Sequence, residues 1–301
     1  MSARKHWNSV EIDHKGLPTS FLNIECHWKE SSLTLTQKRA IDSLSTEYGI
    51  TYGASTPMSP TADLTAPDLG KENVIDPKPC QRLIGSLMYI AQTTRPDILY
   101  AVTYLARRSL SACPRHWDGA IRIARYLYGT ASKGHRIQPG SQVTIWVDAS
   151  YGGEEGRCRM GIVTCIGETA IGWTSHRQSV VALSTTEAEY IAISAGAQQA
   201  AWMKGFLSEL GEDVTPTIIT DNDGAKKLGE NPGFHKRTKH INQRYHYIRH
   251  QLELGELTIE WKAGKWNKAD LLTKALPAPA LKRATDAVMD GHGHEHLSKG
   301  E

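Results

Sequence analysis

The sequence has few cysteines, and their arrangement excludes two kinds of stabilising site. Five occur in 301 residues, they are scattered, and no two form a Cys-x-x-Cys pair. An odd and dispersed set argues against a disulfide framework or a zinc cage and favours a reducing compartment. The chain also lacks an apolar run of membrane-spanning length and starts with polar residues, so we expect neither a signal peptide nor a membrane partner. We therefore expect an intracellular protein, cytoplasmic or nuclear.

The sequence also lacks an excess of either charge. Its 35 Lys and Arg residues nearly balance 32 Asp and Glu residues, which leaves a net charge of +3. Hydrophobic residues make up 40% and charged residues 22%, as in ordinary soluble globular proteins. The total charge therefore points to no class of partner. The length allows two modest domains, each large enough to bury a core.

The first part of the chain predicts a small and mostly helical unit over residues 1–135. Its expected elements are short strands near 20–28 and 33–35 and helices at about 37–48, 79–92, 96–110 and 114–128. Proline lies near the first turn of each of the last three helices, where the missing amide donor costs nothing. The polar faces of these helices suit either solvent or phosphate, and they carry Arg82, Arg95, Arg107, Arg108, Arg115, Arg122 and Arg125.

The second part predicts an α/β domain over residues 141–276. Strands are expected at 143–148, 158–166, 169–174, 216–220 and 257–262, and helices at 185–210, 222–229, 240–254 and from about 268. Three strands in a meander, followed by helix–strand units, imply a mixed sheet. We expect residues 277–301 to be a flexible C-terminal tail, with room for one helix near 281–289.

Acidic residues stand at the ends of the predicted strands. Asp148 ends the first strand of the domain, Asp221 follows the fourth, and Asp270 follows the fifth. Acids at the ends of buried strands are costly to desolvate unless a cation compensates them. Because these acids can converge at one edge of the sheet, we hypothesise a divalent-metal site with oxygen ligands.

Two glutamates open the long helix after the meander, and only one of them can face the sheet. Glu187 and Glu189 point about 200° apart at helical spacing. Capping of the helix is the simplest role for either acid. We prefer Glu189 as the metal ligand because Ala192 and Gly196 give it a face small enough to pack closely on strands. Glu187 remains as the capping acid or as an alternative ligand.

Several motifs occur in a fixed order along the chain. After Asp148 come Ser-Thr-Thr-Glu-Ala-Glu-Tyr-Ile-Ala at 184–192, Thr-Asp-Asn at 220–222, Phe-His-Lys-Arg-Thr-Lys-His-Ile at 234–241 and Ala-Asp-Leu-Leu-Thr-Lys at 269–274. This series resembles the ribonuclease H domain of copia-type retrotransposon polyproteins. Earlier motifs resemble the segment that links the reverse transcriptase palm to that nuclease: Gln-Arg-Leu-Ile-Gly-Ser-Leu-Met-Tyr at 81–89, Thr-Arg-Pro-Asp-Ile at 94–98 and Arg-Tyr-Leu-Tyr-Gly-Thr at 125–130.

The resemblance implies an architecture and an activity. The fold would be a ribonuclease H-like mixed five-stranded sheet with flanking helices, preceded by a truncated palm edge and a thumb-like helical region over residues 1–135. The activity would be hydrolysis of the RNA strand of RNA–DNA hybrids, with two Mg²⁺ ions, or Mn²⁺ as a substitute, held by Asp148, Glu189, Asp221 and Asp270. The family's polymerase aspartates lie in a Tyr-x-Asp-Asp motif, which this sequence lacks. We therefore expect no reverse transcriptase activity.

The resemblance also implies partners. One cluster of basic residues includes Lys236, Arg237, Lys239, His240 and Arg244. Such a cluster suits the phosphates of a duplex. A solvated helix start is the simpler alternative. Candidate minor-groove contacts are Trp173, Gln178, Ser179 and Asn222. The expected partners are an RNA–DNA hybrid and other domains of a retrotransposon polyprotein. Two alternatives are a catalytically inactive nucleic-acid-binding remnant of such a polyprotein and an integrase-type nuclease.

Overall fold

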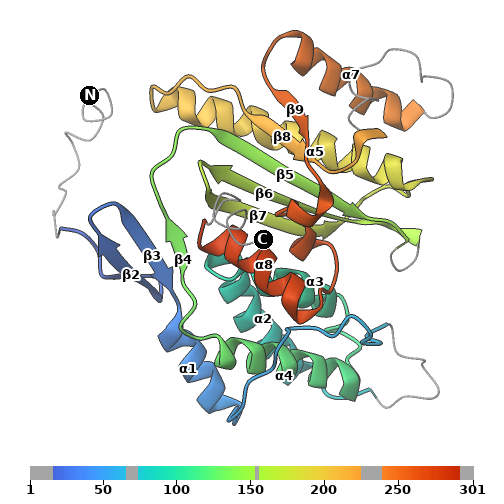
Figure 1. The fold of residues 1–301 in the computed structure, drawn as a ribbon. Helices are drawn as coiled ribbons and strands as arrows, with labels where there is room; N and C mark the ends of the chain where they lie inside the picture. The colour runs from blue at the N-terminus through green and yellow to red at the C-terminus, as the bar shows by residue number, and fades with distance from the viewer. Residues whose placement is uncertain (1–15, 66–73, 153–155, 225–238, 292–301) are drawn as a thin grey trace, which may run out of the picture.

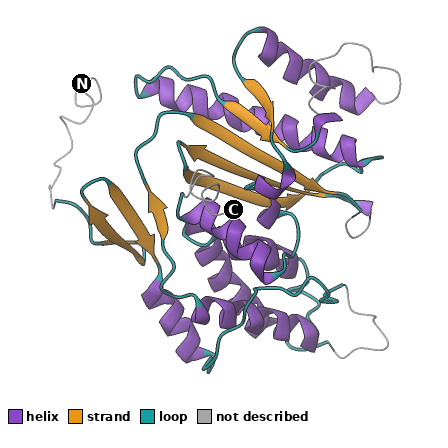
Figure 2. Ribbon diagram, viewed as in Figure 1, coloured by secondary structure: helices purple, strands orange, loops and turns teal. Residues whose placement is uncertain are grey.

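The structure is a computed structural model of the 301-residue chain, and it describes residues 16–65, 74–152, 156–224 and 239–291. Two sheets organise these residues, with helices around them (Figures 1 and 2). A four-stranded sheet has the order β1-β2-β3-β4, and a five-stranded sheet has the order β7-β6-β5-β8-β9. Among the described helices, none is both long and apolar enough to cross a membrane.

The first sheet and four of the helices form the N-terminal unit. Its elements are β1 (Ser20–Phe21), β2 (Ile24–Lys29), β3 (Ser32–Thr36), α1 (Lys38–Glu47), α2 (Pro77–Thr93), η2 (Pro96–Ile98), α3 (Leu99–Ala106), α4 (Pro114–Gly129) and β4 (His135–Ile137). The predicted short strands and helices are present, but the helix expected over 96–110 already ends at Ala106. Strand β4 returns to pair with β3 before the chain enters the second sheet.

The second sheet confirms the predicted mixed topology. Its strands and helices are β5 (Val143–Ser150), β6 (Arg159–Ile166), β7 (Thr169–Arg177), α5 (Thr185–Glu209), β8 (Thr217–Thr220), α7 (Lys239–Glu253), β9 (Thr258–Trp261), η4 (Gly264–Trp266), η5 (Asp270–Leu272) and α8 (Ala278–Met289). Strands β5, β6 and β7 are antiparallel, whereas β8 is parallel to both β5 and β9. Most of the predicted helix 222–229 lies outside the described residues, as do residues 230–238.

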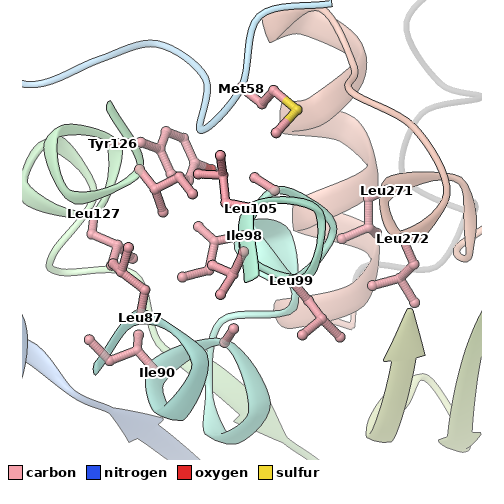
Figure 3. Close-up of a cluster of buried hydrophobic side chains, with 14 of the residues drawn as sticks. Met58, Leu87, Ile90, Ile98, Leu99, Leu105, Tyr126, Leu127, Leu271 and Leu272 are labelled. Carbon is pink, nitrogen blue, oxygen red and sulfur yellow. The ribbon is translucent and has the colours of Figure 1, made fainter. Parts of the chain in front are cut away.

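The two parts of the chain share one hydrophobic core. Figure 1 shows α5 and α7 on one side of the five-stranded sheet and α2, α3 and α8 on the other. On that second side, Leu99 and Leu105 of α3 lie in the same cluster as Leu271 and Leu272, which follow the last strand (Figure 3). The cluster also contains Trp146 of β5. The sheet therefore rests directly on the helical unit.

The C-terminal segment confirms the helix for which the sequence left room near 281–289, and it corrects the expectation of flexibility for the residues of that helix. Residues 278–289 form α8, which buries Leu281, Val288 and Met289. The first and second of these belong to the shared core, and Lys133 forms an ion pair of 2.7 Å with Asp286. An amphipathic helix is stabilised mainly by its packing partner, which the sequence pattern of this segment did not reveal. Residues 292–301 lie outside the described part of the chain.

Arg95 corrects a second expectation, because it does not lie on a polar helix face. Its side chain is fully buried and donates to both carboxylate oxygens of Asp97, at 2.9 and 2.8 Å. It also donates to the carbonyl of Thr130 at 3.1 Å, while the Tyr126 hydroxyl donates to Asp97 at 2.7 Å. Charge-assisted bidentate bonds such as Arg95–Asp97 are among the strong side-chain hydrogen bonds. The bonds of Arg95 to Thr130 and of Tyr126 to Asp97 tie η2 to α4 inside the core.

Candidate metal centre

Three carboxylates that are far apart in sequence meet at one edge of the five-stranded sheet. Asp148, Glu189 and Asp221 each offer an oxygen, and these atoms all lie within 4.8 Å of one another. Trp146 of β5 pairs in parallel with Ile219 of β8, and each aspartate stands two residues further along its chain. Because the strands run the same way, both aspartates emerge at the same edge, as the sequence predicted.

Helix α5 brings Glu189 to this edge because it packs very closely on β5. A Cβ atom at Gly196 would lie 2.8 Å from Cγ1 of Val147, so a larger residue would push the helix away from the strand. Glu189 is consequently only 7% exposed and lies beside Asp148, which is 4% exposed. The small helical face that favoured Glu189 in the sequence is the face that contacts the sheet.

Glu187 has a different position, at the start of α5. Its backbone N–H donates to the N-cap hydroxyl of Ser184 at 3.2 Å, and its carboxylate accepts the N–H of Leu183 at 2.9 Å. These bonds satisfy amide groups that a helix N-terminus otherwise leaves without partners. Glu187 is absent from the three-carboxylate group, so the structure places it as a helix-capping acid.

Asp270 lies at the border of the group and belongs to η5, where a helix had been expected from about 268. Gly161 of β6 pairs with Asp148, and a Cβ atom there would lie 2.7 Å from Cβ of Leu272. This glycine therefore lets the segment 269–273 lie against the sheet beside Asp148. The hydroxyl of Thr273 donates to Asp148, which fixes the orientation of that carboxylate.

The clustered acids repel one another, and their burial prevents water from screening the repulsion. Burial, followed by the charge of Asp270, raises the pKa of Asp148 to about 6. Burial, followed by the charges of Asp148 and Asp221, raises the pKa of Glu189 to about 9. The pKa of Asp221 is raised for the same two reasons, burial and Asp270. Such shifts mark a place where negative charge gathers without sufficient compensation.

Lys274 supplies part of the missing positive charge. Its ammonium group lies 2.7 Å from the Asp270 carboxylate. Burial alone would lower the pKa of Lys274, but the charge of Asp148 and the bond to Asp270 outweigh it, so the pKa is raised. One ammonium group faces four carboxylates, and the site retains an excess of negative charge.

The residues fit a divalent cation. Oε2 of Glu189 is buried and has no hydrogen-bond partner among the described residues. A buried carboxylate oxygen without a donor is costly, and a cation at the meeting point of Asp148, Glu189 and Asp221 would satisfy it. All donors are hard carboxylate oxygens, which suit Mg²⁺ or Mn²⁺ and not a soft metal.

The raised pKa values predict how pH affects the metal-free protein. Acids whose pKa is higher in the folded state than in the unfolded state favour folding when protonated. Their contribution to the stability of the folded state is complete at pH values below the unfolded-state pKa values of about 4. It is lost as the pH rises through the folded-state pKa values, about 6 for Asp148 and about 9 for Glu189. We therefore expect the melting temperature in EDTA to fall between pH 5 and pH 9.

Divalent metal should counteract this fall, because metal binding requires the deprotonated carboxylates. The stabilisation by Mg²⁺ or Mn²⁺ should thus increase with pH. Thermal unfolding of the wild type and of Glu189→Gln, with and without metal, tests this linkage. The variant should lose much of the pH dependence, whereas identical pH profiles for the two proteins would contradict the prediction.

A loop that sequence reasoning missed supports Asp221. The side-chain amide of Asn267 donates to the Val147 carbonyl at 2.9 Å and to Asp221 at 3.4 Å. A Cβ atom at Gly264 would lie only 2.5 Å from Oδ2 of Asp221. A glycine and an asparagine shortly before Asp270 were visible in the sequence, but nothing local tied them to Asp221.

The close approach of Gly264 predicts the effect of a single methyl group. Gly264→Ala should displace the Asp221 carboxylate and weaken Mn²⁺ or Mg²⁺ binding by about tenfold or more, as loss of outer support commonly does. Isothermal titration calorimetry would measure the affinity. Gly205→Ala is the matched control, because nothing lies within 4 Å of the added atom. Equal metal affinities for the two variants would show that Gly264 does not position Asp221.

Two of the expected minor-groove residues, Trp173 and Gln178, make hydrogen bonds inside the protein. Trp173 donates its indole N–H to the Ala91 carbonyl at 2.8 Å, so it joins the sheet to α2. Gln178 is 1% exposed and donates to the Ala188 carbonyl at 2.7 Å, so it supports the start of α5. Both polar groups form hydrogen bonds to other segments of the chain, and the spacing of residues in the sequence does not predict such bonds. Ser179 is exposed and Asn222 partly exposed, as a contact with substrate would require.

The predicted basic cluster is described only in part. Lys236 and Arg237 lie outside the described residues, and only the backbone of Lys239 and His240 is described, at the start of α7. Arg244 is half-buried on the same helix. The role of this cluster in binding nucleic acid stays a prediction.

Comparison with known proteins gives the chain its family. No family model matches it. The retrovirus-related Pol polyprotein from transposon RE1 of Arabidopsis thaliana is 36% identical over 284 residues, which cover 92% of this chain and 19% of that polyprotein. The corresponding polyprotein from transposon TNT 1-94 of Nicotiana tabacum is 37% identical over 216 residues, 70% of this chain and 16% of its own length. The chain thus spans less than a fifth of the length of these relatives.

Solved structures overlap the chain more loosely. The LC11-RNase H1 complex with an RNA/DNA hybrid covers 48% of this chain and 99% of its own, with 16% identity and a TM-score of 0.36. The foamy viral protease–reverse transcriptase dRH complex with double-stranded DNA covers 80% of this chain and 37% of its own, with 11% identity and a TM-score of 0.44. The strand order and the flanking helices show a ribonuclease H-like fold, and the matched sequences show that the chain belongs to the retrovirus-related Pol polyproteins of copia-type transposons.

Proposed function

We propose that this chain is a metal-dependent endonuclease that hydrolyses the RNA strand of RNA–DNA hybrids. The observation that carries the proposal is the buried meeting of Asp148, Glu189 and Asp221, with Asp270 at its border and Oε2 of Glu189 lacking a donor. Keeping these charges together without a cation is costly, so their arrangement is best explained by metal binding. Membership of the Pol polyproteins supports a nucleic-acid substrate.

Two divalent ions, when bound, would activate the attacking water and stabilise the leaving 3′ oxygen in an in-line displacement at phosphorus. Asp148 is the most buried of the four acids and would help to hold the metal, with its orientation fixed by Thr273. Glu189, Asp221 and Asp270 would be the other ligands. The Lys274 ammonium would offset part of the charge of the incoming phosphate.

The remaining predicted residues have complementary roles in this proposal. Phosphates of the hybrid would contact the basic cluster, which consists of Lys236, Arg237, Lys239, His240 and Arg244. Residues 1–135 would act as a thumb-like support for the nuclease, and other polyprotein domains would be the protein partners. No reverse transcription is proposed for this chain.

A cleavage assay tests the function. The full chain is incubated with a hybrid labelled on the RNA strand, with Mg²⁺, with Mn²⁺ or with EDTA. We expect RNA products with 5′-phosphate and 3′-hydroxyl ends only when metal is present, and no cut in the DNA strand. Binding without cleavage would instead indicate an inactive remnant. Equal cleavage of a DNA duplex would indicate an integrase-type nuclease.

A further inference from the structure

An open trough of about 830 Å³ lies on the helical unit, and none of the metal-centre carboxylates lines it. Helix α4 forms one wall, and the segment 52–64 that runs alongside it forms the other (Figure 1). The backbone N–H of Ala54 donates to the Arg125 carbonyl at 3.3 Å, and the Cα of Gly129 would lie 3.0 Å from a Cβ atom at Gly53. The two walls are therefore held together firmly. We call this feature the α4 trough.

Three arginines of α4 line the trough. Arg115 and Arg122 are seven residues apart, two helical turns, and Arg125 follows one turn later, so all three share a face. Each is held by the opposite wall. Arg122 donates to the Thr56 hydroxyl at 2.9 Å, and Arg115 donates to the Thr65 carbonyl at 3.2 Å. Guanidinium groups already fixed in this way lose little conformational entropy when they bind a ligand.

The trough has a small excess of positive charge, because its three arginines outnumber its acids by one. Two acids also line it, Asp63 and Asp118, and the first lies 3.8 Å from Arg115. The guanidinium of Arg125 stacks over the ring of Tyr52 at 4.3 Å, while Tyr52 remains 57% exposed. An exposed aromatic ring beside arginines is the combination with which proteins hold single-stranded nucleic acid, through stacked bases and neutralised phosphates.

A small cavity lies between the trough and one residue beside the candidate metal centre. Pro57 and Met58 line both the trough and a small neighbouring cavity. That second cavity is bordered by Lys274, whose ammonium group contacts Asp270. At about 10 Å³ this cavity cannot hold a nucleic-acid strand, but its lining places Pro57 and Met58 between the trough and the Lys274 side of the metal centre.

We propose that the α4 trough binds single-stranded nucleic acid extending from a hybrid held at the metal centre. Arg122 and Arg125 neutralise backbone phosphates, and Tyr52 stacks against a base. The path of the strand rests on the proposed function. Binding in the trough does not require cleavage, so the two proposals can fail separately.

Fluorescence anisotropy in EDTA, with the full chain, measures this binding. The probes are a blunt hybrid, hybrids with a 3′ or a 5′ single-stranded extension of DNA or RNA, and the isolated single strand. At least one extension should raise the affinity about fivefold or more, in keeping with the gain from stacking a base. The Arg122→Gln/Arg125→Gln variant should lose this gain. Its plot of log affinity against log salt should be shallower by about 1.4, since each phosphate contact to a single strand contributes about 0.7.

Matched variants separate binding from a loosened trough. Arg82→Gln removes one positive charge from α2 outside the trough, where Arg82 pairs with Glu47, and should leave the extension's effect unchanged. The Arg122→Lys/Arg125→Lys variant keeps the charge and should keep the salt dependence. Asp118→Asn removes a negative charge from the trough and should strengthen binding about twofold or more, a gain that damage to the fold would not produce.

The proposal is overturned if no extension improves affinity, or if the glutamine pair loses no more than Arg82→Gln. It is also overturned if Asp118→Asn leaves the affinity unchanged. If blunt and extended hybrids were both cleaved and bound with equal affinity, the nuclease proposal would stand and the proposal for the trough would fail. If an extension bound through the arginines but no hybrid were cleaved, the proposal for the trough would stand and the nuclease proposal would fail.

Discussion

Asp148→Asn should reduce cleavage of an RNA–DNA hybrid by about three orders of magnitude, which is the scale expected when a central contact to the reacting charge is lost. Asn has the size of Asp and keeps one oxygen for the Thr273 hydroxyl, so the geometry should persist. Only the negative charge between Glu189, Asp221 and Asp270 disappears. Single-turnover cleavage at saturating metal measures the loss.

The same substitution should leave the metal-free protein as stable as the wild type or more stable. Asp148 raises the pKa of Glu189, which shows that the two charges oppose each other in the folded state. Removing one of them relieves this repulsion. Thermal unfolding in EDTA should therefore show an equal or higher melting temperature for the inactive variant. A large fall would mean that the lost activity reflects damage to the fold.

Glu187→Gln is the control for this experiment. The glutamine keeps a carbonyl oxygen for the N–H of Leu183, so the start of α5 should be preserved while a carboxylate next to the centre is removed. We expect cleavage within a fewfold of wild type. If Glu187→Gln were as inactive as Asp148→Asn, the assignment of Glu189 in place of Glu187 would have to be reversed.

Asp97→Ala should destabilise the protein by about 3–5 kcal/mol, the usual cost of leaving one member of a buried ion pair without its partner. Arg95 would keep its charge in a place with no access to water, and the Tyr126 hydroxyl would lose its acceptor. Because domains are stable by only about 5–15 kcal/mol, this is a large share of the total. Urea unfolding followed by circular dichroism measures it.

Two further variants show whether the loss comes from the unpaired charge. Asp42→Ala breaks the exposed pair of Asp42 with Lys38 and should cost at most about 1 kcal/mol, as surface pairs do. The double change Arg95→Leu/Asp97→Leu should cost less than the sum of the two single changes, because no charge then remains buried. A loss below about 1 kcal/mol in Asp97→Ala would show that Arg95 finds another partner.

Much of the candidate site could be predicted because it depends on local periodicity. Strands ending in Asp148 and Asp221 were recognisable from runs of alternating and β-branched residues, and the parallel pairing of β5 with β8 places both acids at one edge. Helical spacing then allowed only one of Glu187 and Glu189 to face the sheet. The small residues Ala192 and Gly196 indicated which one.

Close approach and burial could not be predicted, because they depend on residues far away in the chain. Glycine is needed at positions 161 and 264 because Leu272 and Asp221 lie so close to them that a methyl group would not fit. Arginine is usually exposed, and Arg95 is buried only because Asp97, Tyr126 and Thr130 converge around it.

The sequence by itself determined the order of the elements, the mixed sheet and the acids that end its strands, since each follows from the pattern of neighbouring side chains. Only the tertiary structure decided that α8 packs into the core and that Trp173 and Gln178 face other protein segments. It also decided that the nuclease-like sheet and the helical unit share one core. The physical reason is that periodicity is a local property, whereas the partner that buries a face is chosen by the folded chain as a whole.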